Sequence, residues 1–391
     1  MRYDAKEQMS MKLKRKLSEF LKRETVLTVA VFLAIVSAVM TPPDREYAGY
    51  IDFRTLSILF CLMTVMAGLQ KLGVFRNIAK TLLRYTQNTI QLVEVLVLLC
   101  FFFSMIITND VSLITFVPFT FIVLRLTGEE AVKKLAVPVI VLQTIAANLG
   151  SMLTPIGNPQ NLYLYGKTQM SAGTFILLML PYSLVSLLLL VICGVIVAKR
   201  SRIEVRGAEV LLTEDEKLEQ KKYLLPAYLL LFVLCLLTVA HMIPYPVTLV
   251  TVALAVLLLD RGTIIKVDYS LLLTFVGFFI FIGNMGRMPA FCDFLQKIIG
   301  GREVMTAVIA SQVISNVPAA LLLSGFTENI TALIIGTNLG GLGTLIASMA
   351  SLISYKQVAR QIPGEKKKYF GWFTIANIVF LMILVLENCL L

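Results

Sequence analysis

Two glycine- and proline-rich stretches interrupt long hydrophobic segments of this chain and limit its fold more than any other feature. The first break runs Asn148-Leu-Gly-Ser-Met-Leu-Thr-Pro-Ile-Gly-Asn-Pro-Gln-Asn161, and the second runs Gly336-Thr-Asn-Leu-Gly-Gly-Leu-Gly-Thr344. An unpaired backbone N–H or C=O is costly in hydrocarbon, so irregular backbone persists there only where it lines a cavity or a binding site. Two breaks at corresponding places in two halves of a chain indicate the central site of a secondary transporter.

The composition predicts an all-α polytopic membrane protein. Of the 391 residues, 58% are hydrophobic and only 15% are charged, and the mean hydropathy is +0.83. Soluble domains carry about 25% charged residues. Apolar runs long enough to span a bilayer recur along the chain, at 25–41, 51–69, 90–107, 174–198, 223–243, 268–285 and 371–391.

The net charge of +11 does not indicate nucleic-acid binding, because the basic residues lie in short loops between apolar runs. That placement is the positive-inside pattern of a plasma-membrane protein. The six cysteines stand singly inside apolar segments without CxxC spacing, which argues against disulfides and metal ligation. We therefore expect no metal and no cofactor beyond a coupling ion.

The positive-inside rule predicts a cytoplasmic N-terminus and two repeats of opposite topology. Residues 1–24 form a basic cytoplasmic segment, 25–198 the first repeat, 199–246 a charged cytoplasmic linker with a connecting helix, and 247–391 the second repeat. Only Arg45, Lys167, Arg287, Lys297 and Arg302 then fall outside, with Arg54 inside a span.

Each repeat is expected to contain a re-entrant hairpin followed by a broken helix. The first has a hairpin at 90–124 and a broken helix at 134–165, and the second has a hairpin at 303–326 and a broken helix at 330–354. Counting these with the plain spans gives about 9–11 transmembrane segments. The hairpins enter from opposite sides of the membrane, the first from the cytoplasm.

Weak internal similarity supports two inverted repeats. Residues 51–59, reading IDFRTLSIL, resemble residues 267–275, reading VDYSLLLTF. Thr108-Asn109 and Ser315-Asn316 follow, and then the two Asn-Leu-Gly breaks. Three matches in the same order, each with opposite predicted orientation, favour a duplicated unit over chance.

The breaks offer amides, hydroxyls and glycines for binding. Helix N-termini there suit an anion, whereas C-terminal carbonyls suit Na⁺. Hard oxygen donors fit an alkali cation or a hydrogen-bonded carboxylate, and glycines allow close approach of the backbone. The alternative is that these are packing glycines and helix kinks. The candidate residues are Asn148, Gly150, Ser151, Thr154, Gly157, Asn158 and Asn161 in the first break, and Thr337, Asn338, Gly340, Gly341 and Thr344 in the second.

The hairpin tips, Thr108-Asn109-Asp110 and Ser315-Asn316-Val317, are expected to meet the breaks. Asp110 is the one carboxylate in this set, and it is either a Na⁺ ligand or protonation site, or a cap for the helix that begins at the tip. The second tip has Val317 in its place, so two cation sites would not be equivalent. The side chains at which Na⁺ binding is possible are those of Asn109, Asp110, Asn148, Asn316 and Asn338.

These segments resemble the ion transporter superfamily, which includes divalent anion–sodium symporters, citrate transporters and arsenical pump membrane proteins. The resemblance rests on Gly73-Val-Phe-Arg-Asn-Ile-Ala-Lys80, the two tips, Gly157-Asn-Pro-Gln-Asn161 and Gly336-Thr-Asn-Leu-Gly340. It implies substrate and Na⁺ held between two hairpin tips and two broken helices, with dimeric elevators among the members. Neither tip reads Ser-Asn-Thr, so a dicarboxylate site cannot be transferred intact. The acidic residue at the first tip is closer to the arsenical pump and Na⁺/H⁺ antiporter branches.

The expected function is secondary active transport of a small citrate- or dicarboxylate-like anion, coupled to Na⁺ or H⁺. Efflux of arsenite or another oxyanion, or Na⁺/H⁺ exchange, is the alternative on the same fold. An enzyme is not expected, because the chain has one histidine and lacks HExxH, GxSxG and paired intramembrane aspartates. Expected partners are the small anion, the lipid bilayer and a second copy in a homodimer, and no nucleic acid.

Overall fold

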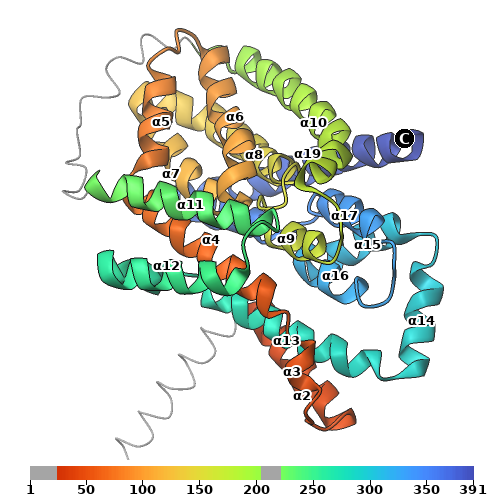
Figure 1. The fold of residues 1–391 in the computed structure, drawn as a ribbon. Helices are drawn as coiled ribbons and strands as arrows, with labels where there is room; N and C mark the ends of the chain where they lie inside the picture. Colours follow the sequence, from red (N-terminus) through yellow and green to blue (C-terminus); the bar gives the residue numbers. More distant parts are fainter. Residues whose placement is uncertain (1–23, 204–221) are drawn as a thin grey trace, which may run out of the picture.

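The computed structural model describes residues 24–203 and 222–391, and every secondary-structure element in these two ranges is a helix (Figure 1). The predicted cytoplasmic segment 1–24, except its last residue, and residues 204–221 of the predicted linker lie outside the described residues. Seven described helices are long and apolar enough to cross a membrane. The prediction of an all-α polytopic membrane protein is confirmed.

The helices form two runs separated by the linker. The first run is α2 (Thr25–Met40), α3 (Tyr47–Tyr50), α4 (Phe53–Lys71), α5 (Val74–Leu83), α6 (Thr89–Ile107), α7 (Asn109–Thr127), α8 (Glu129–Ser151), α9 (Pro159–Gly166) and α10 (Ala172–Ser201). The second is η2 (Lys222–Leu224), α11 (Leu225–Val239), α12 (Tyr245–Leu259), η3 (Arg261–Lys266), α13 (Tyr269–Gly286), α14 (Pro289–Ile299), α15 (Glu303–Ile314), α16 (Asn316–Leu323), α17 (Ile330–Leu339), α18 (Met349–Gln361), η4 (Pro363–Glu365) and α19 (Lys366–Leu390).

Two of the apolar runs form shorter helices than their composition allows. The run 25–41 gives α2 with 16 residues, and 223–243 gives α11 with 15. Proline explains the end of α2, which stops before Pro42-Pro43, whereas α11 ends at Val239, shortly before His241 with its positive φ of 62°. A residue before proline is pushed out of the helical region, and proline itself cannot donate the helical hydrogen bond.

Helices α4 and α13 begin with the same cap, which is where the sequence similarity between 51–59 and 267–275 lies. Asp52 has φ −79° and ψ 86°, and its carboxylate accepts the N–H of Thr55 at 3.0 Å. Asp268 has φ −78° and ψ 84°, and its carboxylate accepts the N–H of Leu271 at 3.0 Å. An aspartate in this position satisfies a free amide at the helix N-terminus. From these caps onward, α4 to α10 and α13 to α19 follow one another in the same order.

The two hairpins pack in the same way, but the ends of the broken helices are exchanged between them. Helices α6, α7 and α8 pack on one another, as do α15, α16 and α17. Beyond its break, however, α9 packs on α16 and α17, whereas α18 packs on α7 and α8. Figure 1 shows α9 beside α16 and α17. This exchange brings both breaks to one place.

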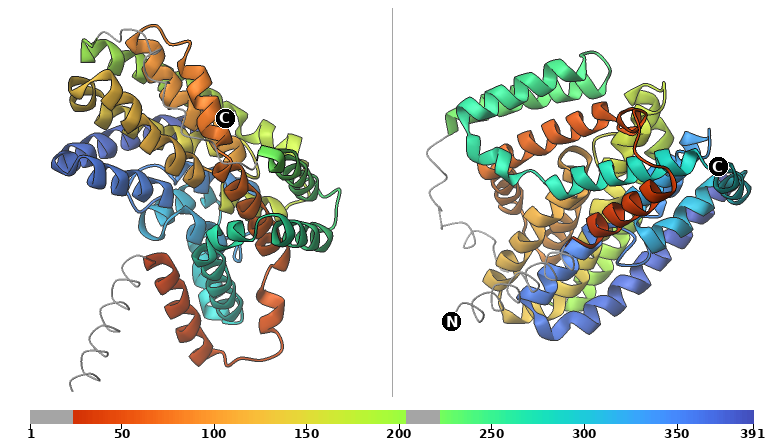
Figure 2. Two further views of the ribbon diagram at one scale, coloured as in Figure 1. Left: turned by 90° about the vertical axis from the view of Figure 1, so that its left-hand side faces the viewer. Right: turned by 90° about the horizontal axis from the view of Figure 1, so that it is seen from below.

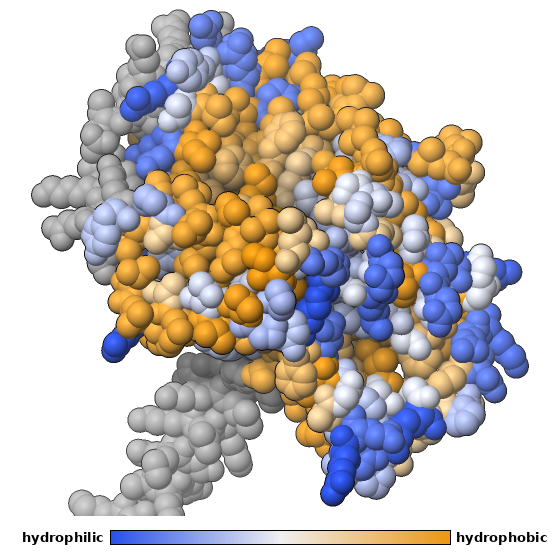
Figure 3. All heavy atoms as spheres, viewed as in Figure 1, coloured by the Kyte–Doolittle hydropathy of each residue, from blue (hydrophilic) through white to orange (hydrophobic). Residues whose placement is uncertain are grey.

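Helix α8 lies at the centre of the bundle and α10 and α19 lie at its surface. The apolar window of α8 is 83% buried, against 33% for α10 and 28% for the helix ending at Leu390. Helices α2 and α13 pack side by side at another edge (Figure 2). A broad apolar surface covers α11 and α12, whereas hydrophilic residues gather around α3 and α14 (Figure 3). Apolar residues at the surface are expected where a bilayer replaces water.

Candidate functional site

The two hairpin tips have the same unusual backbone conformation. Thr108 has φ 72° and ψ 153°, and Ser315 has φ 75° and ψ 154°. Such positive φ values are rare for residues other than glycine and persist only where the surroundings hold them. Here the holding groups are equivalent. The N–H of Asn109 donates to the Gly157 carbonyl at 3.1 Å, and the N–H of Asn316 donates to the Ala347 carbonyl at 2.9 Å.

A threonine in each break fixes the hairpin that precedes it. The Thr154 hydroxyl donates to the Met105 carbonyl at 2.5 Å, and the Thr344 hydroxyl donates to the Gln312 carbonyl at 3.1 Å. Both carbonyls lie three residues before a tip residue of positive φ. Each tip is therefore tied by hydrogen bonds to the break that follows it in the chain, and Thr154 and Thr344 contribute to this link.

Gly150 and Gly340 pack the broken helices against the hairpin arms. A Cβ on Gly150 would lie 2.0 Å from the Phe101 carbonyl oxygen, and one on Gly340 would lie 2.6 Å from the Ser311 hydroxyl. For these two residues the packing alternative is the one that the structure supports. Gly341 lies closer to the tip, because its Cβ would approach the Asn316 amide nitrogen to 3.1 Å.

The asparagines that end α8 and α17 cross over to the opposite break. The Asn148 side-chain oxygen accepts from the Ser348 hydroxyl at 2.9 Å and from the Asn109 amide at 3.2 Å. The Asn338 oxygen accepts from the Asn158 amide at 3.0 Å, and its own amide donates to the Asn161 oxygen at 2.6 Å. The four amides at 109, 148, 158 and 338 are each at most 4% exposed. The Ser151 hydroxyl joins these two groups, because it accepts from the Asn158 amide at 3.3 Å and donates to the Asn148 carbonyl at 2.9 Å, so both breaks belong to one polar network inside an apolar bundle.

Two helix N-termini and two helix C-termini meet in this network. Helix α9 starts at Pro159, after Asn158, whose side chain accepts the N–H of Asn161 at 2.9 Å. Helix α18 starts at Met349, after Ser348. Free N–H groups at helix starts attract anions, and free carbonyls at helix ends attract cations. The arrangement can therefore bind both signs of charge.

A cavity of about 170 Å³ opens beside the first tip. Thr108 and Asp110 of the tip and Asn158 of the first break line it, together with the inner side of α4 and with Lys266 and Asp268. Asp110 lies in the first turn of α7, but the Asn109 side chain accepts the Asp110 N–H at 2.9 Å. Within the described residues, no hydrogen bond of the Asp110 carboxylate caps α7. The Asn109 side chain thus satisfies one amide of the first turn of α7, and Asp110 lines the cavity.

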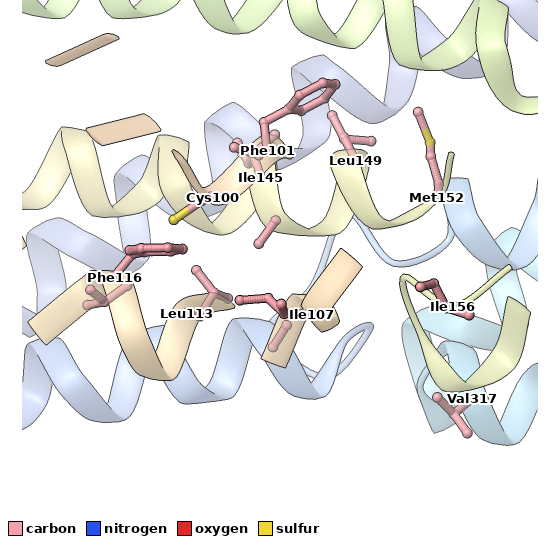
Figure 4. Packing of buried hydrophobic residues seen from close by; sticks show 14 of the residues in the cluster. Cys100, Phe101, Ile107, Leu113, Phe116, Ile145, Leu149, Met152, Ile156 and Val317 are labelled. Carbon is pink, nitrogen blue, oxygen red and sulfur yellow. The ribbon is translucent and has the colours of Figure 1, made fainter. Parts of the chain in front are cut away.

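The second tip differs in chemistry although its backbone matches. The Asn316 side chain accepts the Val317 N–H at 3.0 Å, as Asn109 does at the first tip. Val317 itself is buried in the apolar cluster, near Ile156 of the first break (Figure 4). The one carboxylate of the two tips is therefore Asp110.

Several predicted residues make hydrogen bonds to the main chain around the breaks. The Thr337 hydroxyl donates to the Leu333 carbonyl of its own helix at 2.7 Å. The Ser151 hydroxyl donates to the Asn148 carbonyl at 2.9 Å, and the Ser315 hydroxyl to the Ala347 carbonyl at 3.4 Å. The Asn161 amide reaches carbonyls of the first break, of which that of Thr154 is at 3.2 Å.

Sequence reasoning missed Ser348, Gln312 and the pair Lys266 and Asp268. Ser348 could have been found, because it follows Asn338 by the same ten residues that separate Asn158 from Asn148. Gln312 joins the second hairpin to its break by donating to the carbonyls of Gly340 and Leu342 at 3.1 and 2.9 Å. Lys266 and Asp268 precede α13, and nothing in the sequence places them beside Asp110.

Comparison with known proteins gives consistent matches over most of the chain. A sequence model of a family described as citrate transporter matches residues 17–330. An uncharacterized transporter of Methanocaldococcus jannaschii is 31% identical over 361 residues, 92% of this chain and 94% of that protein. An inner membrane protein of Escherichia coli is 32% identical over 320 residues, 80% of this chain and 82% of that protein. A silicon efflux transporter of Oryza sativa subsp. japonica is 32% identical over 153 residues, 38% of this chain and 30% of that protein.

Proposed function

This chain belongs to the citrate transporter family, and we propose that it is a secondary active transporter that moves a small anion coupled to Na⁺ or H⁺. The observation that carries the proposal is the crossing of the two breaks. Asn148 reaches Ser348, and Asn338 reaches Asn158, so that both half-helix starts and both half-helix ends lie in one buried polar network. In a bundle of apolar helices, a buried polar network of this kind is costly, and it is typical of the place where a transporter binds its solute.

In this proposal the coupling cation binds at the first tip and the anion at the helix starts. Asp110 and the side-chain and main-chain oxygens near Asn109 are hard donors, which Na⁺ prefers and which also suit a proton. The anion is held by N–H groups at the start of α18 and by that of Gln160 at the start of α9, because Pro159 has no N–H and Asn158 accepts the N–H of Asn161. Lys266 supplies a positive charge on the wall of the cavity. Binding of the cation beside Asp110 lowers the electrostatic cost of admitting the anion.

The proposal includes opposite orientation of the two repeats and re-entry of the hairpins. The arms of the second hairpin have 12 and 8 residues, which is too short to cross a membrane and supports re-entry, whereas the arms of the first have 19 residues each and are long enough to cross. Accessibility tests this in a variant without native cysteines. Glu129→Cys and Glu328→Cys, both exposed after their hairpins, should react with a membrane-impermeant maleimide from opposite sides. Reaction of both cysteines from the same side of the membrane would refute the inverted topology.

The test of function is solute uptake by purified protein in proteoliposomes. Labelled citrate, dicarboxylates and sulfate are offered in turn, each with an imposed Na⁺ gradient and then with an imposed pH gradient. We expect accumulation of one anion class that requires one of the two gradients. If no anion accumulates under either gradient while counterflow of the same anions is also absent, anion symport is refuted.

A second candidate is efflux of a small hydrogen-bonding oxyacid such as arsenite. Two observations favour it: the crossing of the breaks is made of neutral amides and hydroxyls, and part of the chain resembles a silicon efflux transporter. Counterflow of arsenite and of silicic acid in the same vesicles distinguishes this function from anion symport. Proton movement driven by a Na⁺ gradient, with no solute added, would indicate Na⁺/H⁺ exchange instead.

A further inference from the structure

An apolar groove of about 580 Å³ lies between α8, α10 and α19, and none of its lining residues belongs to the tips or the breaks. Its wall is aliphatic over most of its length. The residues that make this wall include Val141 and Leu142 of α8, Ile196 and Val197 of α10, and Ile375 and Val379 of α19. A groove of this size is large enough to hold a ligand, and its position on surface helices makes it accessible from the membrane.

One end of the groove is strongly cationic. Lys133 and Lys134 at the start of α8, Arg200 at the end of α10 and Lys368 at the start of α19 all line it. Lys134 and Lys368 each form an exposed ion pair with a glutamate about one turn earlier, at 2.7 and 3.0 Å. The interaction energy of such exposed ion pairs is small. Within the described ranges, Lys133 and Arg200 are in no ion pair, so both are available to an anionic group.

The length of the groove matches one leaflet of a bilayer. On α19 the lining residues run from Lys368 through Trp372 to Phe380. At 1.5 Å per residue these twelve steps cover about 18 Å, close to half of a hydrocarbon core of about 30 Å. Trp372, the one tryptophan of the chain, lies one turn from the cationic end, where tryptophan marks the headgroup level. Charge and apolar length are thus arranged as in a phospholipid.

We propose that this groove binds one anionic glycerophospholipid. The headgroup phosphate lies among Lys133, Arg200 and Lys368, and an acyl chain runs along the wall toward Phe380. The wall is open to the membrane, because Ile375 is 67% and Val379 50% exposed. A soluble anion would leave that wall uncovered, and a lipid without net charge would leave the cations unmatched. Basic pockets between membrane helices favour anionic headgroups in this way.

Native mass spectrometry of the full chain in mild detergent tests the proposal. The protein is supplied with equal amounts of phosphatidylglycerol and phosphatidylcholine of the same acyl length. We expect one phosphatidylglycerol to be retained in preference to phosphatidylcholine. Lys133→Gln with Arg200→Gln should weaken that retention at least ten-fold. A matched control removes two exposed cations of α18, Lys356→Gln with Arg360→Gln, and should retain the lipid as the unaltered protein does.

A second variant fills the groove and keeps every charge. Ala376→Phe places a ring on the α19 side of the wall and should exclude the acyl chain, which lowers retention even if the charge variant fails to fold. The proposal is overturned if the two lipids are retained equally, or if the control loses phosphatidylglycerol as the charge variant does. It is also overturned if glycerol phosphate alone displaces the lipid at equal concentration. Cross-linking of Ile375→Cys between copies of lipid-free protein would make the groove a subunit interface instead.

Discussion

Replacing Asn338 with alanine tests whether the crossing of the breaks binds solute or only joins helices. The side chain makes three hydrogen bonds: it accepts from Asn158 at 3.0 Å and donates to Asn161 at 2.6 Å and to Ile334 at 2.8 Å. After truncation Asn158 keeps its bond to Ser151 at 3.3 Å. The Asn161 oxygen loses the hydrogen bond that the structure gives it.

The expected loss of stability follows from that one buried acceptor. A buried polar group without a partner costs about 1–3 kcal/mol. We therefore expect Asn338→Ala to fold and insert, with a free energy of unfolding lower by that amount and a correspondingly lower unfolding temperature. If Asn338 also contacts the bound ion or anion, a lost hydrogen bond to a charged group of about 1.5–3 kcal/mol weakens binding about 10- to 150-fold.

The assay measures both effects on the same preparation. Half-saturation and rate are measured in proteoliposomes, and thermal unfolding is followed with and without the transported solute, which stabilises only a protein that binds it. Asn377→Ala is the control. Asn377 is equally buried, its amide donates to the Phe373 carbonyl of its own helix at 2.8 Å, and its oxygen has no partner among the described residues. Its removal should change neither transport nor solute-induced stabilisation.

Two results would refute the reasoning. Transport by Asn338→Ala with unaltered half-saturation would reduce the crossing to a structural contact. Equal loss of transport in the Asn377 variant would mean that any buried asparagine is required for a functional fold, and that the effect says nothing about the site.

Three further predictions concern charge. Asp110→Asn should alter the Na⁺ or pH dependence of transport more than the half-saturation for solute, with little loss of stability because the Asn109 side chain still accepts the N–H of residue 110; unaltered Na⁺ and pH profiles would show that Asp110 takes no part in coupling. Lys71→Met breaks an ion pair with Asp260 at 2.9 Å and should lower unfolding stability by less than the about 3–5 kcal/mol of a fully buried pair. Adding Asp260→Leu should restore most of it, and a double variant as unstable as the sum of both single variants would contradict this. The Arg287 guanidinium holds the pKa of Asp44 below its usual value, so the ion pair stabilises the folded protein above about pH 3.9 and stops doing so as the pH falls through the lowered pKa. Asp44→Asn should therefore be less stable than the unaltered protein near neutral pH and equally stable at low pH, as measured by thermal unfolding across that range.

The helical elements of the fold, and most residues of the polar network that the structure brings together, could be recognised from local sequence. Apolar runs, the Asn-Leu-Gly breaks and the two tips are patterns within a few residues, and the structure places them in one network. Asp52 and Asp268 are further local signals, because an aspartate before an apolar run is a helix cap. For these features, nothing beyond neighbouring residues was needed.

The exchange of half-helices could not be predicted, because it depends on packing between distant segments. Asn148 meets Ser348 because α18 packs on α7 and α8, and no local pattern states that pairing. The same holds for Lys71 and Asp260. Thr337 shows the converse: a threonine beside Asn338 is a reasonable ligand by sequence, but its hydroxyl bonds to the carbonyl four residues earlier, as threonine often does inside helices.

The two hairpin tips share backbone geometry but not charge, and this asymmetry bears on the proposed coupling. The tips agree within a few degrees at Thr108 and Ser315, and both asparagines after them bind the carbonyl of a break. Only the first tip adds a carboxylate, Asp110, beside a cavity that also holds Lys266 and Asp268. A neutral cation site of amides and carbonyls takes up full positive charge on binding, whereas a site with an ionised carboxylate is neutralised by one Na⁺ or one H⁺. In the proposed transporter the first tip therefore carries the ion whose binding costs least in the membrane. The charge of a cation bound at the second tip, beside Val317, would have to be balanced by the anion itself.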